Sequence, residues 1–213
     1  LVRDRGCVVV ANHLSYADPL VVAHYLNDNG IAPSFLGKVE VFNIPVIGKI
    51  LRSARQIPVY RETGQAADAY RAAVAAVEQG RCIVIYPEAT LTRDPDLWPM
   101  RGKTGAARIA LQTRCPVVPV VNWGAQAIIG PYESKPDLLP IKEVIVRAGA
   151  PVDLADLYER PITREVLQQA TDRIMATLTG LLEEVRGEKA PTTRFDPRAV
   201  GIPTKGNPTK EQR

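Results

Sequence analysis

The chain has 213 residues, of which 46% are hydrophobic and 23% are charged. This composition excludes a disordered or fibrous protein, and a chain of this length needs no disulfide or structural metal to supply its core. The formal net charge of +4 lies in the tail, because residues 186–213 hold seven basic and three acidic side chains whereas residues 1–185 hold 20 of each. A domain without net charge has no electrostatic footprint for a phosphate backbone, so we expect no nucleic-acid partner.

Short apolar runs alternate with helical patterns, which is typical of an α/β domain with a mostly covered sheet. We predict one α/β domain over residues 1–185, with a mixed, mostly parallel sheet flanked by helices, and a tail over residues 186–213 that is extended or disordered. Predicted strands lie at residues 7–11, 34–38, 56–60, 82–86, 116–121 and 143–148. Apolar periodicity predicts helices at residues 65–79, 103–113 and 163–185, and Asp18-Pro19 is the start signal of another helix.

Three cysteines, Cys7, Cys82 and Cys115, each adjoin a short apolar run. The pattern predicts buried thiols without a disulfide framework and favours a reducing compartment such as the cytosol. No apolar stretch approaches the roughly 20 residues that span a bilayer, so we expect that this chain does not cross a membrane by itself. Because the chain begins with Leu1 rather than Met, we expect part of the natural amino terminus to be absent. A membrane anchor in that upstream part is left as an open alternative.

The first strand is followed directly by the run Asn12-His13-Leu14-Ser15-Tyr16-Ala17-Asp18-Pro19. In a continuous helix, residues five apart point about 140° away from each other. A loop that ends at a helix entrance can instead fold back and bring the His13 imidazole onto the Asp18 carboxylate, which is the arrangement of an oriented general base. We also expect Asp18 to cap the helix. The alternative is a structural or accidental spacing, and His24 is expected to be a packing or surface residue.

This run resembles the H-x4-D block of the glycerolipid acyltransferase family, which includes the 1-acylglycerol-3-phosphate acyltransferases. Three more segments resemble the later blocks in family order: IPVYR ending at Arg61, YPEAT over residues 86–90, where the family usually has F-P-E-G-T-R, and VPV over residues 118–120. Lys38-Val39-Glu40 resembles the segment between the first two blocks, and residues 101–107 resemble the family's basic helix entrance. The resemblance covers residues 7–150, and the combination is far more specific than any single block.

The resemblance implies a glycerol-3-phosphate/lysophosphatidate acyltransferase-like fold and direct transfer of an acyl group from acyl-CoA or acyl carrier protein to a lipid hydroxyl. Lysophosphatidic acid is the expected acceptor and phosphatidic acid the product, made at the cytoplasmic face of the cell membrane without a metal or bound cofactor. His13 and Asp18 are the implied catalytic residues, and neither Ser15 nor Cys7 is expected to form an acyl-enzyme. The implied substrate-binding residues are Lys38, Arg61, Glu88, Ala89, Thr90 and Lys103, with Arg61 and Lys103 on the acceptor phosphate and Glu88 on its hydroxyls or capping a turn.

Three positions depart from the family pattern: Arg55 and Ala89 stand where glycine is usual, and Leu91 stands where arginine is usual. Losing that arginine removes a planar five-donor phosphate ligand, which Arg93, Arg101 or Lys103 could replace. Another lysolipid or glycolipid acceptor, or a non-catalytic lipid-binding scaffold, therefore stays an alternative. The apolar segments 45–47, 50–51 and 98–100 suit an acyl chain, the bilayer interface or simply the core.

Overall fold

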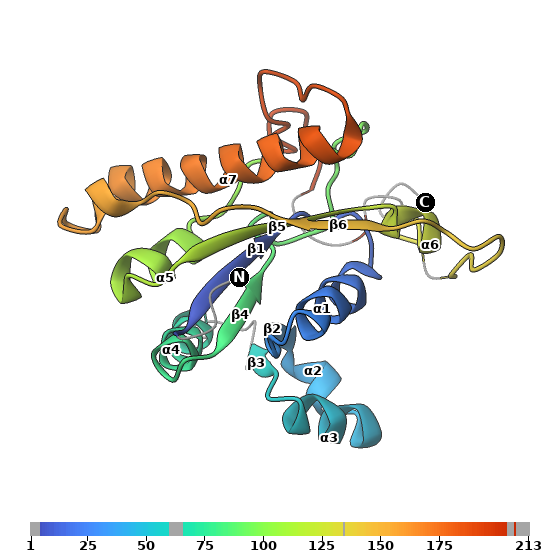
Figure 1. Cartoon of the computed structure of the whole chain (residues 1–213), viewed down its shortest axis with the longest axis horizontal. Helices are drawn as coiled ribbons and strands as arrows, with labels where there is room; N and C mark the ends of the chain where they lie inside the picture. Colours follow the sequence, from blue (N-terminus) through green and yellow to red (C-terminus); the bar gives the residue numbers. More distant parts are fainter. Residues whose placement is uncertain (1–4, 60–65, 134, 204–206, 208–213) are drawn as a thin grey trace.

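The computed structural model describes residues 5–59, 66–133, 135–203 and 207 (Figure 1). Across these residues, six strands form a sheet in the order β3-β2-β4-β1-β5-β6. The strands are β1 (Cys7–Ala11), β2 (Pro33–Lys38), β3 (Ile57–Val59), β4 (Cys82–Ile85), β5 (Val117–Trp123) and β6 (Ile145–Ala148). All neighbouring pairs are parallel except β5 and β6, which are antiparallel. The predicted fold class and all six predicted strands are confirmed.

The helices are α1 (Asp18–Asp28), α2 (Val39–Phe42), α3 (Pro45–Ser53), α4 (Ala66–Glu78), α5 (Gly105–Thr113), α6 (Ala125–Ile128) and α7 (Arg164–Arg186), with a 3-10 turn at Ala155–Leu157. The four helices expected from the sequence are present, and their bounds agree to within two residues where a range was predicted. The short helices α2, α3 and α6 were not predicted. The long α7 is capped by Thr163, whose hydroxyl accepts from the N–H of Val166, and it ends before Gly187, which has the left-handed conformation.

Strand β1 runs through the centre of the sheet, and all five of its residues are buried. Its side chains alternate between two cores: Val8 and Val10 pack with α4, α5 and α7, whereas Cys7 and Val9 pack with α1. Figure 1 shows α7 and α1 on opposite faces of the sheet. A strand covered on both faces needs a continuous apolar run rather than an alternating one, which is why its sequence is CVVVA.

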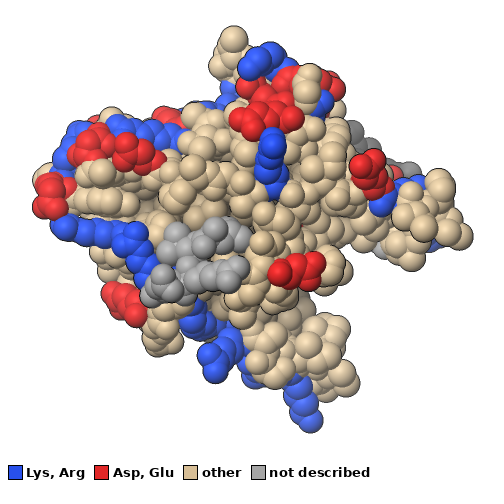
Figure 2. Space-filling model, in the orientation of Figure 1, with Lys and Arg blue, Asp and Glu red and all other residues tan. Residues whose placement is uncertain are grey.

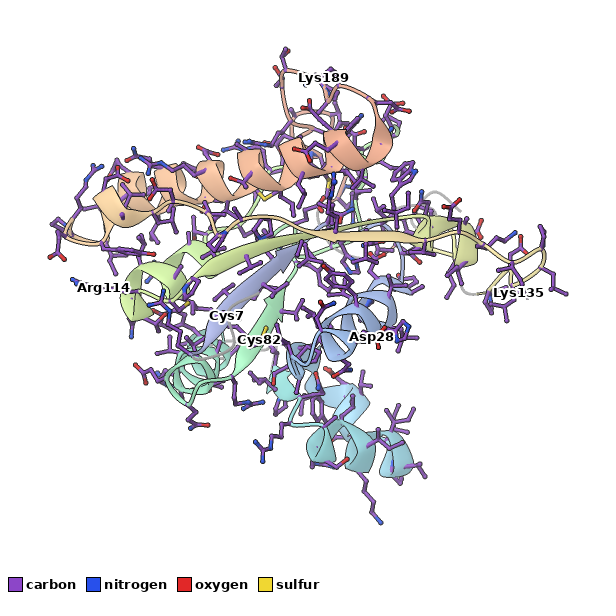
Figure 3. The ribbon with its side chains drawn as sticks, viewed as in Figure 1. Cys7, Asp28, Cys82, Arg114, Lys135 and Lys189 are labelled. Carbon is purple, nitrogen blue, oxygen red and sulfur yellow. The ribbon has the colours of Figure 1, made fainter. Side chains whose placement is uncertain are left out.

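The three cysteines are buried and free, as predicted. Cys7 and Cys82 are register partners on the neighbouring strands β1 and β4, and Figure 3 labels both. No helix among the described residues is long and apolar enough to cross a membrane.

The described part of the tail returns along the body of the domain. The guanidinium of Arg186 lies 3.8 Å from the ring centroid of Trp98 and 4.3 Å from that of Trp123. Further on, Arg101 donates its N–H to the carbonyl of Phe195 and pairs with Asp196 at 3.1 Å. Trp98 packs beneath α7 and Met100 is buried as well, so of the surroundings expected for segment 98–100 the core is confirmed.

Candidate active site

Two loops leave the carboxyl edge of the sheet side by side, because β1 and β4 are parallel neighbours. This edge is where open α/β sheets place their ligands. The N–H of His13 donates to Glu88 Oε1 at 3.2 Å, and the carbonyl of His13 accepts from the N–H of Thr92 at 2.7 Å. The loop after β1 is therefore fixed to the loop after β4 at the backbone of His13.

The side chains of His13 and Asp18 meet as the spacing indicated. His13 Nδ1 lies 2.7 Å from Asp18 Oδ2, and Asp18 is fully buried. The same oxygen also accepts from the N–H groups of Leu14, at 2.6 Å, and Ser15, at 2.8 Å. A carboxylate on Nδ1 holds the proton there and leaves the lone pair on Nε2, so the pair has the geometry of an oriented base. The catalytic role itself stays a prediction.

The prediction that Asp18 caps α1 is wrong. The N-cap residue is Ala17, no side chain caps this end, and Asp18 is the first residue of the helix. Its carboxylate faces back toward the loop, where Oδ2 collects three donors, and Oδ1 has no hydrogen-bond partner among the described residues. The local capping preference gives way here because the loop supplies more donors than the helix end.

Sequence reasoning missed Tyr86 as a partner of the histidine. Its ring stacks on the imidazole of His13, with centroids 4.1 Å apart and planes 21° apart. Burial, followed by the nearby Asp18 carboxylate, raises the pKa of the Tyr86 hydroxyl well above its usual value, so the hydroxyl stays protonated. The aromatic residue at the first position of the third block was the available signal. Tyr86 and Asp18 together fix both the plane and the tautomer of the base.

Asn12 was also missed, and it anchors the start of the same loop. Its side-chain amide donates to the carbonyl of Asn122 and accepts from the N–H of Asn122, both at 2.9 Å. Ser15 is structural too, because its hydroxyl donates to the carbonyl of Ile129 at 2.7 Å and accepts from the N–H of Ala17 at 2.9 Å. A buried hydroxyl with both roles occupied is a poor nucleophile, which agrees with the expectation that no acyl-enzyme forms on Ser15.

Glu88 is buried, and each of its carboxyl oxygens accepts from a backbone N–H: Oε1 from His13 and Oε2 from Met100 at 3.0 Å. Burial, the largest influence, raises the pKa of Glu88 to about 8. The carboxyl is therefore largely protonated near neutral pH. Its two hydrogen bonds connect the histidine loop to the backbone of Met100. Glu88 also lines one of the two pockets described next.

Two hollows flank the short turn over residues 88–90. The first, called here the apolar pocket, holds about 580 Å³ and extends from His13 between the ends of β2 and β4 and helices α2 to α5. Its walls are mostly apolar and include Phe35, Leu36, Phe42, Leu51, Ala69, Tyr70, Ala73, Val84, Tyr86, Ala89 and Ile109. The second, the basic pocket, holds about 530 Å³, and its walls include Glu88, Thr90, Arg101, Lys103, Arg108, Arg164, Gln168 and Arg198.

The predicted substrate-binding residues divide between these pockets. Thr90 and Lys103 line the basic pocket with Glu88, whereas Ala89 lines the apolar pocket beside His13. Lys38 ends β2, but its side chain lies outside the described residues, as does the whole of Arg61. These placements leave the binding roles as predictions.

Leu91, which replaces the usual arginine, is buried, and its carbonyl accepts from the Tyr132 hydroxyl at 2.8 Å. Of the three cations that could replace that arginine, Arg101 and Lys103 line the basic pocket. Arg93 instead is buried and holds its guanidinium 5.7 Å from the Tyr132 ring centroid. The basic pocket therefore contains cations although the third block has lost its own.

The two other departures from the family pattern share one backbone feature. Arg55 has a φ of 54° and Ala89 a φ of 60°, which is the left-handed region that glycine adopts without steric cost. The family pattern has glycine at these positions because the backbone there adopts a positive φ. This chain keeps the same turns with residues that carry a Cβ.

The sequence pattern of the acyltransferase family matches residues 1–123. This chain belongs to the acyltransferase family. Among relatives, the chloroplastic 1-acyl-sn-glycerol-3-phosphate acyltransferase of Brassica napus is 32% identical over 127 residues, which make up 59% of this chain and 35% of that protein. The beta form of the Homo sapiens enzyme is 29% identical over 123 residues, or 57% of this chain and 42% of that protein. The matched part of this chain therefore spans less than half of the length of these curated relatives.

The crystal structure of the 1-acyl-sn-glycerophosphate (LPA) acyltransferase PlsC from Thermotoga maritima shares the fold. The TM-score is 0.65 over 89% of this chain and 70% of that chain, at 23% identity. The four blocks of this chain lie inside the residues 1–123 that match the family, whereas α7 and the tail lie beyond them. Among its described residues, no group of three or more His, Cys, Asp or Glu side chains is arranged to hold a metal ion.

Proposed function

We propose that this chain transfers a fatty acyl group from an acyl thioester to the hydroxyl of lysophosphatidic acid, which gives phosphatidic acid. One observation carries the proposal: the His13–Asp18 pair is 2.7 Å apart and lies where an apolar and a basic pocket approach each other across a three-residue turn. A lysophospholipid and an acyl thioester together present one reacting centre between apolar chains and a phosphate. The two pockets supply surfaces of these two kinds.

In the proposed reaction, His13 Nε2 takes the proton of the acceptor hydroxyl as the hydroxyl oxygen attacks the thioester carbonyl carbon. The tetrahedral intermediate collapses, the carbon–sulfur bond breaks, and the leaving sulfur takes the proton from the imidazolium to give a free thiol. Asp18 stabilises the imidazolium between these steps, and a positioned base of this kind contributes about 10² to 10⁴-fold in rate. The activated thioester makes a further cofactor unnecessary.

The apolar pocket takes an acyl chain, because each buried methylene contributes about 0.8 kcal/mol. The basic pocket takes the acceptor phosphate through Lys103 and Arg108, a compact charge and a planar fork on one helix entrance. The donor is acyl-CoA or acyl carrier protein, which present the same thioester to His13. The lipid acceptor places the reaction at a membrane surface, and the reducing conditions that three free thiols favour fit its cytoplasmic face.

A second acceptor class follows from Leu91. Because the third block lacks its arginine, the phosphate contact depends on cations from other segments, and another lysophospholipid or a glycolipid acceptor fits the same chemistry. The intact His13–Asp18 contact favours turnover over a non-catalytic lipid-binding scaffold.

The test is release of free thiol by the purified chain in mixed micelles, with palmitoyl-CoA or palmitoyl-acyl carrier protein as donor and lysophosphatidic acid, glycerol 3-phosphate or other lysolipids as acceptor. The matched variants are His13→Ala and His24→Ala, because His24 is 80% exposed on α1. We expect turnover with lysophosphatidic acid that His13→Ala abolishes and His24→Ala retains. A preference for another acceptor would change the assigned substrate but keep the mechanism. If no donor–acceptor pair gives turnover that depends on His13, the proposal is overturned.

A further inference from the structure

We propose that α3 and the loop over residues 138–141 form a docking face for an anionic phospholipid leaflet, with α1 and the histidine loop that precedes it between them. The inference rests on the proposed function, because a lipid acceptor must reach His13 from a membrane surface. It adds which surface of the molecule faces the lipid.

Helix α3 presents an apolar face to solvent. Val46 is 70% exposed and Ile50 is 58% exposed, and Ile44 and Ile47 beside them are also exposed. The helix contains no acidic residue, and its two charges are the cations Lys49 and Arg52. An apolar face bordered by cations is the pattern of a helix that lies in the interface of an anionic leaflet.

The other face of the α2–α3 hairpin belongs to the apolar pocket, through Val41, Phe42 and Leu51. The hairpin is tightly packed: a Cβ at Gly48 would lie 1.9 Å from the carbonyl oxygen of Phe42, and Arg52 donates to that same oxygen at 2.9 Å. The segment that would enter the leaflet is thus also the wall of the pocket proposed for the acyl chain. A lipid chain could pass from the leaflet to the pocket along a single hairpin.

A second exposed apolar group lies on the loop that follows α6. Leu139 is 80% exposed, Ile141 is 92% exposed, and Leu138 is also exposed. The base of this loop is bound to the active-site loops, since Ile129 accepts from the Ser15 hydroxyl and the Tyr132 hydroxyl donates to the carbonyl of Leu91. The loop therefore stands beside the histidine loop, on the other side from α3.

The figures show the same arrangement. Figure 1 shows α3 and the loop beyond α6 as two projections that extend away from the sheet, with α1 between them. In Figure 2 both projections are mostly tan, with Lys or Arg atoms toward the margins of the first and atoms of both charge signs at the second, on which Figure 3 labels Lys135. Tyr16 and Leu20, at the start of α1, are exposed between the two groups.

The charges and the shape favour a leaflet over a protein partner. Lys49 and Arg52 border the apolar group of α3 without an acidic residue in that helix, and this match to anionic lipid carries the charge argument. The loop contributes apolar area rather than net positive charge, because Lys135 and Lys142 stand among Glu133, Asp137 and Glu143, and Asp137 pairs with Lys142 at 2.9 Å. Two separate apolar projections can both enter a soft, continuous surface. A protein partner would need a matching recess for each.

The test is co-sedimentation of the 213-residue chain with vesicles of phosphatidylcholine and phosphatidylglycerol, and with vesicles of phosphatidylcholine alone. The patch variants are Ile47→Asp/Ile50→Asp on α3 and Leu139→Asp/Ile141→Asp on the loop. The matched control is Val200→Asp, an exposed apolar residue of the tail. We expect each patch variant to lower the vesicle partition coefficient at least tenfold and the control to leave it unchanged. Lys49→Gln/Arg52→Gln should weaken binding to the anionic vesicles only.

Vesicle binding is measured without turnover, so this proposal and the proposed function can fail separately. Patch variants that keep their His13-dependent thiol release with a short-chain lysolipid below its micellar concentration are folded. Equal vesicle binding by such variants and the wild type overturns the docking face. A wild-type dimer in light scattering that the patch variants convert to monomers overturns it as well, because the two faces would then cover each other.

Discussion

The two pockets beside residues 88–90 differ in origin as well as in polarity. Every residue in the wall of the apolar pocket lies inside the segment that matches the family, whereas the basic pocket also takes Arg164 from α7 and Arg198 from the tail. The half of the site proposed for the acyl chain is therefore built from shared sequence. The half proposed for the acceptor is completed by residues beyond it, so the acceptor must be measured on this chain rather than carried over from relatives.

The largest expected effect comes from Asp18, because its carboxylate supports the base that reacts with the substrates of both pockets. Replacing Asp18 with Asn removes the charge that stabilises the imidazolium, and we expect kcat to fall by about 10³ to 10⁴-fold. The loss should be equal for every acyl-chain length and every acceptor. Asp28→Asn, at the exposed partner of His24, is the control in the same assay. A loss confined to one acceptor would instead assign Asp18 to the basic pocket.

Glu88 stands between the two pockets, and its titration should be visible in stability. Because its pKa in the folded chain is about 8, against 4.5 as the ordinary value, the folded state holds a proton that the unfolded state has lost between these two values. Wild-type stability should therefore fall as the pH rises from about 4.5 to 8, by up to about 4 kcal/mol relative to Glu88→Gln. Urea denaturation of both proteins at pH 5 and pH 8 measures the difference, and parallel pH profiles would contradict it.

Neutralising the basic pocket should affect the acceptor and spare the donor chain. We expect Lys103→Gln to raise KM for lysophosphatidic acid by about 10 to 100-fold, because one charge-assisted hydrogen bond contributes about 1.5–3 kcal/mol. The preference among acyl-chain lengths should not change. Lys189→Gln, at a side chain that is 89% exposed beyond α7, is the matched control. If the variant raised the KM of the acyl donor more than that of the acceptor, the basic pocket would be assigned to the donor instead.

Filling the apolar pocket should have the converse effect. Ala69 lies in its wall on α4, and Ala69→Leu should reduce kcat/KM about tenfold for long-chain donors while short-chain donors react as before. The control is Ala75→Leu, at an exposed position of the same helix. Equal losses at all chain lengths would mean that the pocket does not hold the acyl chain.

The smallest effect concerns the turn that separates the pockets. Ala89 has a left-handed backbone, so Ala89→Gly should raise the free energy of unfolding by up to about 1 kcal/mol while acceptor preference stays the same. Thermal denaturation and the acceptor panel test the two parts separately. A change of acceptor in this variant would show that the departure from glycine governs specificity as well as backbone conformation.

Sequence alone predicted the sheet because its strands are short apolar runs, and it predicted the His13–Asp18 contact because the pair spans a loop and a helix start. It missed α3, where Gly48 interrupts a nine-residue helix, although the bilayer interface was one of the surroundings expected for segment 45–47. The cap expected for Asp18 failed because three loop donors compete with the helix end. The first position of the third block marked Tyr86 as aromatic, but no local pattern records that its ring meets His13. Asn12 was missed for the same reason, because its partner Asn122 lies far away in the chain.

The stacking of Tyr86 on His13 makes the site observable without substrate. Ring protons of an imidazole that lies against an aromatic face resonate upfield of their usual positions, and the chain has only two histidines, the other of which is exposed on α1. A nuclear magnetic resonance spectrum of the histidine side chains should therefore contain two separable sets of signals. The shifted set reports the protonation of His13 directly and signals the arrival of a lipid in the pocket beside it.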